Sequence, residues 1–345
     1  MVYCLFCEYA LVITIHSKSY SYIQAGHRVC PSMSAYERVF LAGDAVHTHT
    51  AKAGKGMNLS MQDSYNLGWK LASFLRGVAS PEILKTYHLE RMQTSKRLVA
   101  FDKKLYFEIA SREQDLQGLR NVLRDENTLE SGMAVVYSPS ILTISPPKGS
   151  RFGTDNASVR ENGTQHLSFA HRLVVGGRVP SAPLTRHCDV RPVELQTLLP
   201  ATGQWHLLVF GGNISNPEQM LRVQTMASQI TTRSTCLSRF TNPRPGQHVV
   251  GTIKTYLIHS APRLSIEQQQ LPELFLPFHE DYGYDYERVY ADLDRTNSLS
   301  TYGKLGISPD GCMVLVRPDQ HISFIGSLQD APLLENFMAG ITKIA

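Results

Sequence analysis

The sequence contains no long run of basic residues, and its formal net charge is only +4 over 345 residues. So small a charge on a chain of this length gives no support for a nucleic-acid surface. No apolar stretch reaches the roughly 20 residues that a membrane-spanning helix needs. The mostly apolar segment 1–15 is interrupted by Glu8 and carries no basic n-region or small-residue cleavage site. We therefore expect neither nucleic acid nor a membrane among the partners.

Cysteine is sparse and has no framework spacing. The six cysteines are Cys4, Cys7, Cys30, Cys188, Cys236 and Cys312. Scattered thiols of this kind predict reduced cysteines and a cytoplasmic location. Cys4 and Cys7 form a nominal C-x-x-C, but a redox dithiol needs that motif at a helix start after a strand. We interpret this pair as incidental.

Two glycine motifs are also missing. No G-x-S-x-G elbow occurs, which excludes the common serine hydrolase arrangement. No G-x-G-x-x-G turn occurs near the N-terminus either, because Gly26 is the first glycine and Gly43 the next. That turn seats the pyrophosphate of a dinucleotide in a βαβ unit. The sequence therefore has no complete dinucleotide-binding unit of this type.

The most informative stretch that is present covers 38–58 and reads R-V-F-L-A-G-D-A-V-H-T-H-T-A-K-A-G-K-G-M-N. Its start predicts a buried strand over 39–42, and Gly43 then permits a backbone conformation closed to other residues. Asp44 can accept hydrogen bonds from sugar-like hydroxyls. A helix is expected to begin near Asn58, and its free N–H groups favour an electron-rich ligand. The stretch therefore predicts a site for a polyhydroxylated ligand.

Together with S-M-Q-D-S-Y-N-L-G-W-K-L-A at 60–72, this stretch resembles the second flavin-binding motif of the FAD-dependent aromatic hydroxylases, in the phenol 2-monooxygenase branch. The resemblance implies FAD as cofactor, with NADPH as reductant and a small phenolic substrate. It places Asp44 at the ribityl chain and the turn that follows at the flavin ring. The cofactor-binding candidates are Gly43, Asp44, Gly54, Lys55, Gly56, Met57 and Asn58.

The sequence departs from the family pattern at the reactive edge of this site. Ala51 stands where the family has a proline, so the loop loses a fixed backbone angle. Lys55 stands where glutamine is commoner, and Ile23 stands where a tyrosine is common. The residues that deprotonate the substrate lie in the N-terminal part of the family, so we name no catalytic base.

A metal site is an alternative reading of the same loop. Asp44, His47 and His49 bring a carboxylate and two imidazoles close together, and this set could ligate zinc or iron. No second cluster supplies further ligands, so we expect no metal. The other interpretation is that both imidazoles hydrogen-bond the backbone of a cofactor loop.

Two helices are predicted after this site. The first starts near Leu59, and its expected buried residues are Tyr65, Leu67, Leu71, Ala72 and Leu75. The second begins at Ser80-Pro81-Glu82. Its expected buried residues are Ile83, Leu84, Tyr87, Leu98, Phe101 and Leu105. The charged residues Lys70, Arg76, Arg91 and Lys96 are expected on solvated faces.

The C-terminal part opens with Gly176-Gly177-Arg178-Val179-Pro180-Ser181-Ala182-Pro183, which resembles the start of the thioredoxin-like domain of phenol hydroxylases. Strands are predicted over 205–210, 288–292, 313–316 and 321–325, with a hairpin across Asp319-Gln320 and a helix over 333–341. Gly211-Gly212-Asn213 follows the first strand in place of a C-x-x-C. We therefore expect this domain to pack or to form a homodimer rather than to perform redox chemistry.

The predicted fold class is mixed α/β, with an incomplete FAD-binding domain of the aromatic-hydroxylase type followed by a thioredoxin-like α/β domain. The expected divisions are a non-family segment at 1–22, the FAD-binding and substrate part at 23–145, a linker at 146–165 and the thioredoxin-like domain at 166–345. Two functions stay open. The chain is the C-terminal portion of an FAD-dependent aromatic monooxygenase, inactive alone, or it is a non-catalytic flavoprotein remnant that acts through its thioredoxin-like domain.

Overall fold

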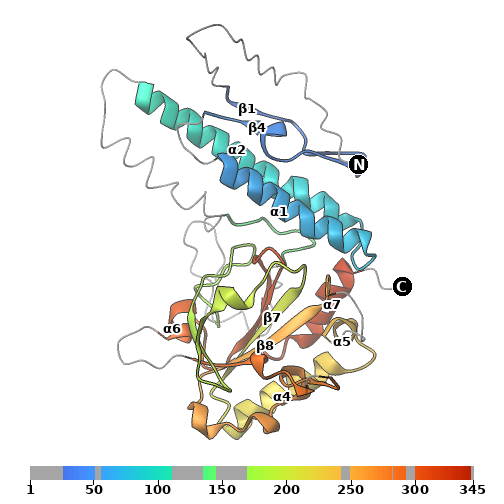
Figure 1. Cartoon of the computed structure of the whole chain (residues 1–345), viewed down its shortest axis with the longest axis vertical. Helices are drawn as coiled ribbons and strands as arrows, with labels where there is room; N and C mark the ends of the chain where they lie inside the picture. The colour runs from blue at the N-terminus through green and yellow to red at the C-terminus, as the bar shows by residue number, and fades with distance from the viewer. Residues whose placement is uncertain are drawn as a thin grey trace. The chain divides into compact units, whose positions relative to one another are not determined.

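The computed structural model describes residues 26–50, 56–110, 135–144, 169–241, 249–281, 283–292 and 300–342. The chain divides into two compact units (Figure 1). The helical unit contains the described residues before 72 and from 81 to 135, and the sheet unit contains 72–80 and the rest. The segments expected at 1–22 and 146–165 lie outside the described residues. Among the helices of these described ranges, none combines the length and apolar character needed to cross a membrane.

Two long helices dominate the helical unit, α1 (Gly56–Leu75) and α2 (Glu82–Ala110), and they lie side by side (Figure 1). The apolar spacing expected for the second helix is confirmed, because all its predicted core positions are buried. They are Ile83, Leu84, Tyr87, Leu98, Phe101 and Leu105. A small cluster forms where Tyr87 and Met92 of α2 meet Met33 and Val46.

The strands of the helical unit are short. They form two antiparallel pairs, β1 (Arg28–Val29) with β4 (His47–Thr48) and β2 (Ser34–Ala35) with β3 (Val39–Phe40). The buried strand expected over 39–42 is wrong, since β3 has two residues and both are half-buried. The physical reason is that β2 is its one partner among the described residues, so no broad sheet covers its faces.

The buried face of α1 also differs from the prediction. Tyr65 and Leu75 are exposed, and Leu67, Leu71 and Ala72 are only half-buried. The residues that are buried on α1 are Leu59, Asp63, Asn66, Trp69, Lys70 and Ser73. They recur at helical spacing, but most are polar, so a search for apolar periodicity passes over them.

Two charged residues expected in solvent are buried. Lys70 is 0% exposed and Arg91 is 1% exposed, so the prediction of solvated faces is wrong for both. Each has a carboxylate partner across α1 and α2, and such pairing is what makes a buried charge tolerable. For Arg76 and Lys96, which are exposed, the prediction is confirmed.

The sheet unit is built on a seven-stranded mixed sheet with the order β13-β12-β7-β8-β11-β5-β6. Its strands are β5 (Pro183–Arg186), β6 (Pro192–Glu194), β7 (Trp205–Gly212), β8 (Ile253–His259), β11 (Val289–Asp292), β12 (Cys312–Val316) and β13 (Ile322–Gly326). β7, β8 and β11 are mutually parallel, and the other neighbours are antiparallel. A separate antiparallel pair joins β9 (Phe278–His279) to β10 (Gly283–Tyr284).

The helices of this unit are α4 (Pro217–Thr231), α5 (Cys236–Thr241), α6 (Thr301–Leu305) and α7 (Ala331–Ile341). α4, α5 and α7 contact one another, and each contacts a strand of the sheet (Figure 1). The sequence β7-α4-β8 followed by β12-β13-α7 reproduces the thioredoxin core, with β8 parallel and β12 antiparallel to β7. The predicted mixed α/β class is confirmed.

Most predicted elements of the sheet unit are confirmed. β7, β11, β12, β13 and α7 coincide with the predicted segments within a few residues, and β12 and β13 form the expected hairpin. The strand β8 was missed, although it lies at the centre of the sheet. Leu208 and Phe210 of β7 share one core cluster with Tyr302 of α6. Their neighbours Leu207 and Val209 therefore face the side on which α4 contacts β7.

Candidate functional site

The turn at Gly43 has the conformation that its sequence predicts. Gly43 has φ +61°, in the left-handed region that favours glycine, and it starts a 3-10 turn over Gly43–Ala45. Val46 N donates to Gly43 O at 2.8 Å and closes this turn. The side chain of Asp44 is exposed. A Cβ atom added at Gly43 would lie 2.9 Å from Ser60 Cβ, so the turn packs closely against the first part of α1.

The other end of the loop meets the start of α1. A Cβ atom added at Gly56 would lie 2.5 Å from His49 Cε1, so only glycine allows this approach. Met57 is 73% exposed, and Asn58 is half-buried in the same first turn. Gly54 and Lys55, like Ala51 and Ile23, lie outside the described residues. The structure therefore packs the Gly43 turn against Ser60 and packs Gly56 against His49, so the loop meets α1 at two points near the start of that helix.

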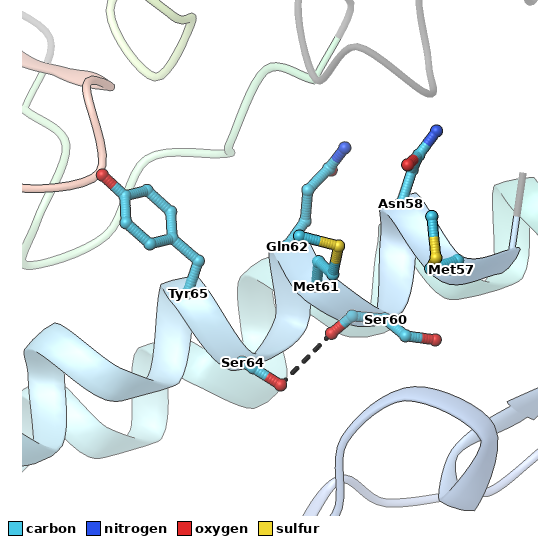
Figure 2. Close-up of a pocket in the computed structure, with 7 residues that line it drawn as sticks. All are labelled: Met57, Asn58, Ser60, Met61, Gln62, Ser64 and Tyr65. Atoms are coloured by element: carbon cyan, nitrogen blue, oxygen red, sulfur yellow. Dashed lines mark hydrogen bonds between the residues drawn. The ribbon is translucent and has the colours of Figure 1, made fainter. Parts of the chain in front are cut away.

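A surface hollow of about 800 Å³ extends along the N-terminal half of α1. Figure 2 shows its lining side chains projecting from successive turns of that helix. They are Met57, Asn58, Ser60, Met61, Gln62, Ser64 and Tyr65. Met61 is 62% exposed and Tyr65 is 41% exposed, which leaves apolar side chains open along this face. The hollow contains both described candidates of the Gly-x-Gly-Met-Asn turn that follow Gly56.

The buried carboxylate of Asp63 hydrogen-bonds the turn at Gly43. Asp63 Oδ2 accepts from Gly43 N at 3.1 Å and lies 3.0 Å from His47 Nε2. Asp63 Oδ1 accepts from Arg91 Nε at 2.6 Å. Burial acts to raise the pKa of Asp63, but the hydrogen bonds and charges of His47 and Arg91 outweigh it and lower that pKa below its ordinary value. Asp63 therefore carries its negative charge at neutral pH.

A second buried carboxylate, Asp102, holds the far end of the same loop. Its Oδ2 accepts from Thr50 N at 2.6 Å, and its Oδ1 accepts from Thr50 Oγ1 at 2.8 Å. His27 Nε2 lies 2.9 Å from Asp102 Oδ2. The two hydrogen bonds from Thr50 fix this end of the loop to α2.

The two histidines of the metal hypothesis are used in other ways. His47 Nε2 faces Asp63, and His49 Nδ1 lies 2.8 Å from Thr50 O, where it can donate. Within the described ranges, no three His, Cys, Asp or Glu side chains are grouped closely enough to hold a metal ion. The contact of His49 with the loop backbone agrees with the second interpretation for that residue, whereas His47 bonds the carboxylate of Asp63 and not the backbone.

Sequence reasoning missed Asp63, Arg91 and Asp102. A weak signal was present, because Asp63, Asn66 and Lys70 recur at helical spacing with Leu59. Such a polar stripe is usually a solvated face, and only the carboxylate partners on the other helix or loop show that it is buried.

Residues 135–344, more than half of the chain, match the family model described as phenol hydroxylase, C-terminal dimerisation domain. The chain belongs to the phenol hydroxylase family. Residues 8–102 match the model described as FAD binding domain. This matched range includes the Gly43 turn and the start of α1. The predicted relationship to FAD-dependent aromatic hydroxylases is thereby confirmed.

Curated relatives of this phenol hydroxylase family member are FAD-dependent monooxygenases of about twice its length. It is 33% identical over 311 residues to the FAD-dependent monooxygenase terD of Aspergillus terreus, covering 86% of this chain and 48% of the relative. It is 32% identical over 324 residues to the phenol 2-monooxygenase fsqG of Aspergillus fumigatus, covering 92% of this chain and 50% of the relative. The chain thus spans about half the length of the curated relatives it matches.

The fold is also found in a solved hydroxylase. A ternary complex of aklavinone-11 hydroxylase with FAD and aklavinone matches with a TM-score of 0.54 at 20% identity, over 92% of this chain and 45% of the other. At this identity the match establishes the shared fold.

Proposed function

We propose that this chain supplies the ribityl-contacting and ring-contacting part of a flavin site in an FAD-dependent monooxygenase. The observation that carries the proposal is the exposed carboxylate of Asp44 on a glycine turn that packs against Ser60 of α1. The turn contacts α1 at Ser60, close to the start of the helix, where the first backbone N–H groups have no acceptor within the helix.

The described residues fit FAD in three ways. Asp44 is exposed and can accept hydrogen bonds from the ribityl hydroxyls. The first turn of α1, with Gly56, Met57 and Asn58, offers backbone N–H groups to electron-rich ring atoms. The hollow beside it has the open apolar side chains of Met57 and Met61 for a planar ring (Figure 2). When bound, FAD supplies the redox chemistry, and the protein contributes binding and orientation.

The proposed reaction is hydroxylation of a phenolic ring with NADPH and O₂. Support comes from the phenol 2-monooxygenase among the relatives and from the FAD binding domain matched at 8–102. No described side chain is assigned as the base that deprotonates the substrate. Gly54 and Lys55 remain part of the proposed site on the sequence alone.

The sheet unit is proposed to form a homodimer. Its match to a dimerisation domain supports this. Gly211 and Gly212, the last two residues of β7, stand where a C-x-x-C would be needed for redox chemistry. A cytoplasmic location is part of the same proposal, and the scattered cysteines support it. Light scattering of the purified chain tests the dimer, and a monomer at micromolar concentration would contradict it.

FAD titration tests the flavin site. The sequence has no G-x-G-x-x-G turn, so we expect weak reversible binding, seen as quenching of flavin fluorescence, and no NADPH turnover by the chain alone. Asp44→Ala should weaken binding by about ten-fold, since the side chain that accepts hydrogen bonds from the ribityl hydroxyls is lost. Glu280→Ala, an exposed acidic residue of the sheet unit, is the matched control and should leave affinity unchanged. Equal affinity of Asp44→Ala and the parent chain would refute this site.

A further inference from the structure

The loop over 43–50 is held at both ends by carboxylates that solvent does not reach. Asp63 of α1 and Asp102 of α2 are each 0% exposed. Asp63 bonds the backbone N–H of Gly43, and Asp102 bonds the backbone N–H of Thr50. These partners are 20 and 52 residues away in sequence, so the contacts exist only when the loop is folded onto both helices.

Such an arrangement is poorly explained by stability alone. A buried carboxylate is tolerated only when it is fully hydrogen-bonded, and apolar side chains of similar size usually serve stability as well. What apolar residues cannot do is fix the direction of a backbone N–H. In this loop, the two fixed N–H groups belong to Gly43, which precedes Asp44, and to Thr50, which follows His49.

The charge on Asp63 has its own counterion. Arg91 Nε donates to Asp63 Oδ1 at 2.6 Å, and Arg91 Nη2 donates to Leu59 O at 3.4 Å. One oxygen of Asp63 is therefore engaged by Arg91, and the other faces Gly43 N and His47 Nε2. This division gives Asp63 an orientation in which Oδ2 points to the loop.

We propose that Asp63 and Asp102 are positioning residues of the flavin site, which hold the two ends of loop 43–50 so that Asp44 stays directed toward the cofactor. The inference rests on the proposed function, because Asp44 is placed at the ribityl chain there. Neither carboxylate needs to touch FAD. Asp63 acts through Gly43, and Asp102 acts through Thr50.

The helical unit offers a matched control for this inference. Lys70 and Glu90 form another buried ion pair between α1 and α2, with Nζ 2.7 Å from Oε2, and they hydrogen-bond Asn66. Replacement of either ion pair by apolar residues removes buried charge from the same two helices. The Asp63 pair differs in that it bonds the loop through Gly43.

The variants are Asp63→Leu/Arg91→Met, Asp102→Leu and the control Lys70→Met/Glu90→Leu in the full chain. FAD affinity is measured by fluorescence titration, thermal stability by melting, and the exchange of the Gly43 and Thr50 amides by NMR. The first double variant should weaken FAD binding at least about ten-fold and speed exchange at Gly43, because that N–H loses its charged acceptor. Asp102→Leu should do the same at Thr50. The control should keep the parent affinity and the slow exchange of both amides, whatever its melting temperature.

Unchanged FAD affinity in both loop variants would overturn the inference, as would an equal loss of affinity in the control. If the parent chain takes up no FAD, the proposed function of this chain fails. The positioning role of Asp63 and Asp102 is then decided by the amide exchange of Gly43 and Thr50. Faster exchange at Gly43 and Thr50 in their respective variants, absent from the control, supports the positioning role, and unchanged exchange refutes it.

Discussion

Lys70 Nζ lies 2.7 Å from Glu90 Oε2, and the two side chains are 0% and 2% exposed. Asn66 completes the pair, since its Nδ2 donates to Glu90 Oε2 at 2.8 Å and its Oδ1 accepts from Lys70 Nζ at 2.7 Å. Charges buried in this way are stable together and strongly destabilising when left alone. The packing of α1 on α2 therefore depends on paired charges as well as on apolar contacts.

Removal of one member of this pair should be costly. Lys70→Met leaves the Glu90 charge buried without its counterion and should lower the free energy of unfolding of the helical unit by about 3–5 kcal/mol. Lys70→Met/Glu90→Leu should recover part of that loss, because no charge is left buried but the buried Asn66 loses two hydrogen bonds. Trp69 and Trp205 are the two tryptophans, so urea unfolding followed by Trp69 fluorescence in a Trp205→Phe background reports this unit. A loss below about 1 kcal/mol in the single variant, the range of exposed pairs, would contradict the expectation.

The same pair shows why the buried face of α1 could not be predicted from the sequence. Periodicity rules count apolar residues, and by that count Tyr65 and Leu75 were expected inside α1. They are exposed, whereas Lys70 is buried, because its partner Glu90 comes from another helix. A long charged side chain is normally solvated, and only knowledge of a partner distant in sequence reverses that expectation.

Where the pattern depends on local chemistry, the sequence was a good guide. The six apolar positions of α2 are all buried, and Gly43 has the positive φ expected of it. The strand at 39–42 was overpredicted because its length depends on partner strands. The strand β8 was missed because Lys254 and Thr255 interrupt its apolar run. At the site, the turn and the helix start could be predicted, but the buried carboxylates of Asp63 and Asp102 that hydrogen-bond the loop could not.

A substitution at Gly43 should disturb both the turn and the flavin site. In Gly43→Ala, the side chain must adopt φ +61° and approach Ser60 Cβ and Oγ at 2.9 Å. The expected cost is about 1–3 kcal/mol of unfolding free energy, together with weaker FAD binding. Gly68→Ala is the contrasting control, because Gly68 lies inside α1 with no atom within 4 Å of an added Cβ. It should stabilise the helix by about 0.5–1 kcal/mol. Equal stability of the two variants would show that the turn tolerates a side chain.

The sheet unit should lose stability as the pH falls below neutrality. Burial, with a smaller contribution from the Lys254 charge, lowers the pKa of His206 to about 4 from 6.5. Burial, and then the neighbouring His187, lowers the pKa of His259 to about 4 from 6.5. Between these values the unfolded chain binds protons that the native protein does not. The stability is therefore complete above pH 6.5 and declines toward pH 4, by at most about 3 kcal/mol for each histidine.

His206→Leu separates this effect from other titrations. The variant has no imidazole to protonate, so its unfolding free energy should fall less steeply between pH 6.5 and 4.5 than that of the parent chain. Urea unfolding at several pH values, followed by Trp205 in a Trp69→Phe background, provides the slopes. His279→Leu, which replaces an exposed histidine, is the control for the substitution itself. Identical slopes for His206→Leu and the parent chain would mean that native His206 takes up its proton over the same pH range as in the unfolded chain.

Tyr302 joins the ends of the two central parallel strands. Its hydroxyl donates to Ile258 O of β8 and accepts from Gly212 N of β7, both at 2.8 Å. Burial raises the pKa of Tyr302, so this hydroxyl stays protonated. Tyr302→Phe removes both bonds and leaves a buried N–H without its partner, at an expected cost of about 1–3 kcal/mol.

Tyr290→Phe is the matched control, because Tyr290 donates one bond to Glu287 O at 2.8 Å, three residues earlier in the chain. Its loss should be about 1 kcal/mol or less. Unfolding followed by Trp205 fluorescence compares the two, and a loss in Tyr302→Phe no larger than in Tyr290→Phe would show that another group satisfies Gly212 N once the hydroxyl is gone.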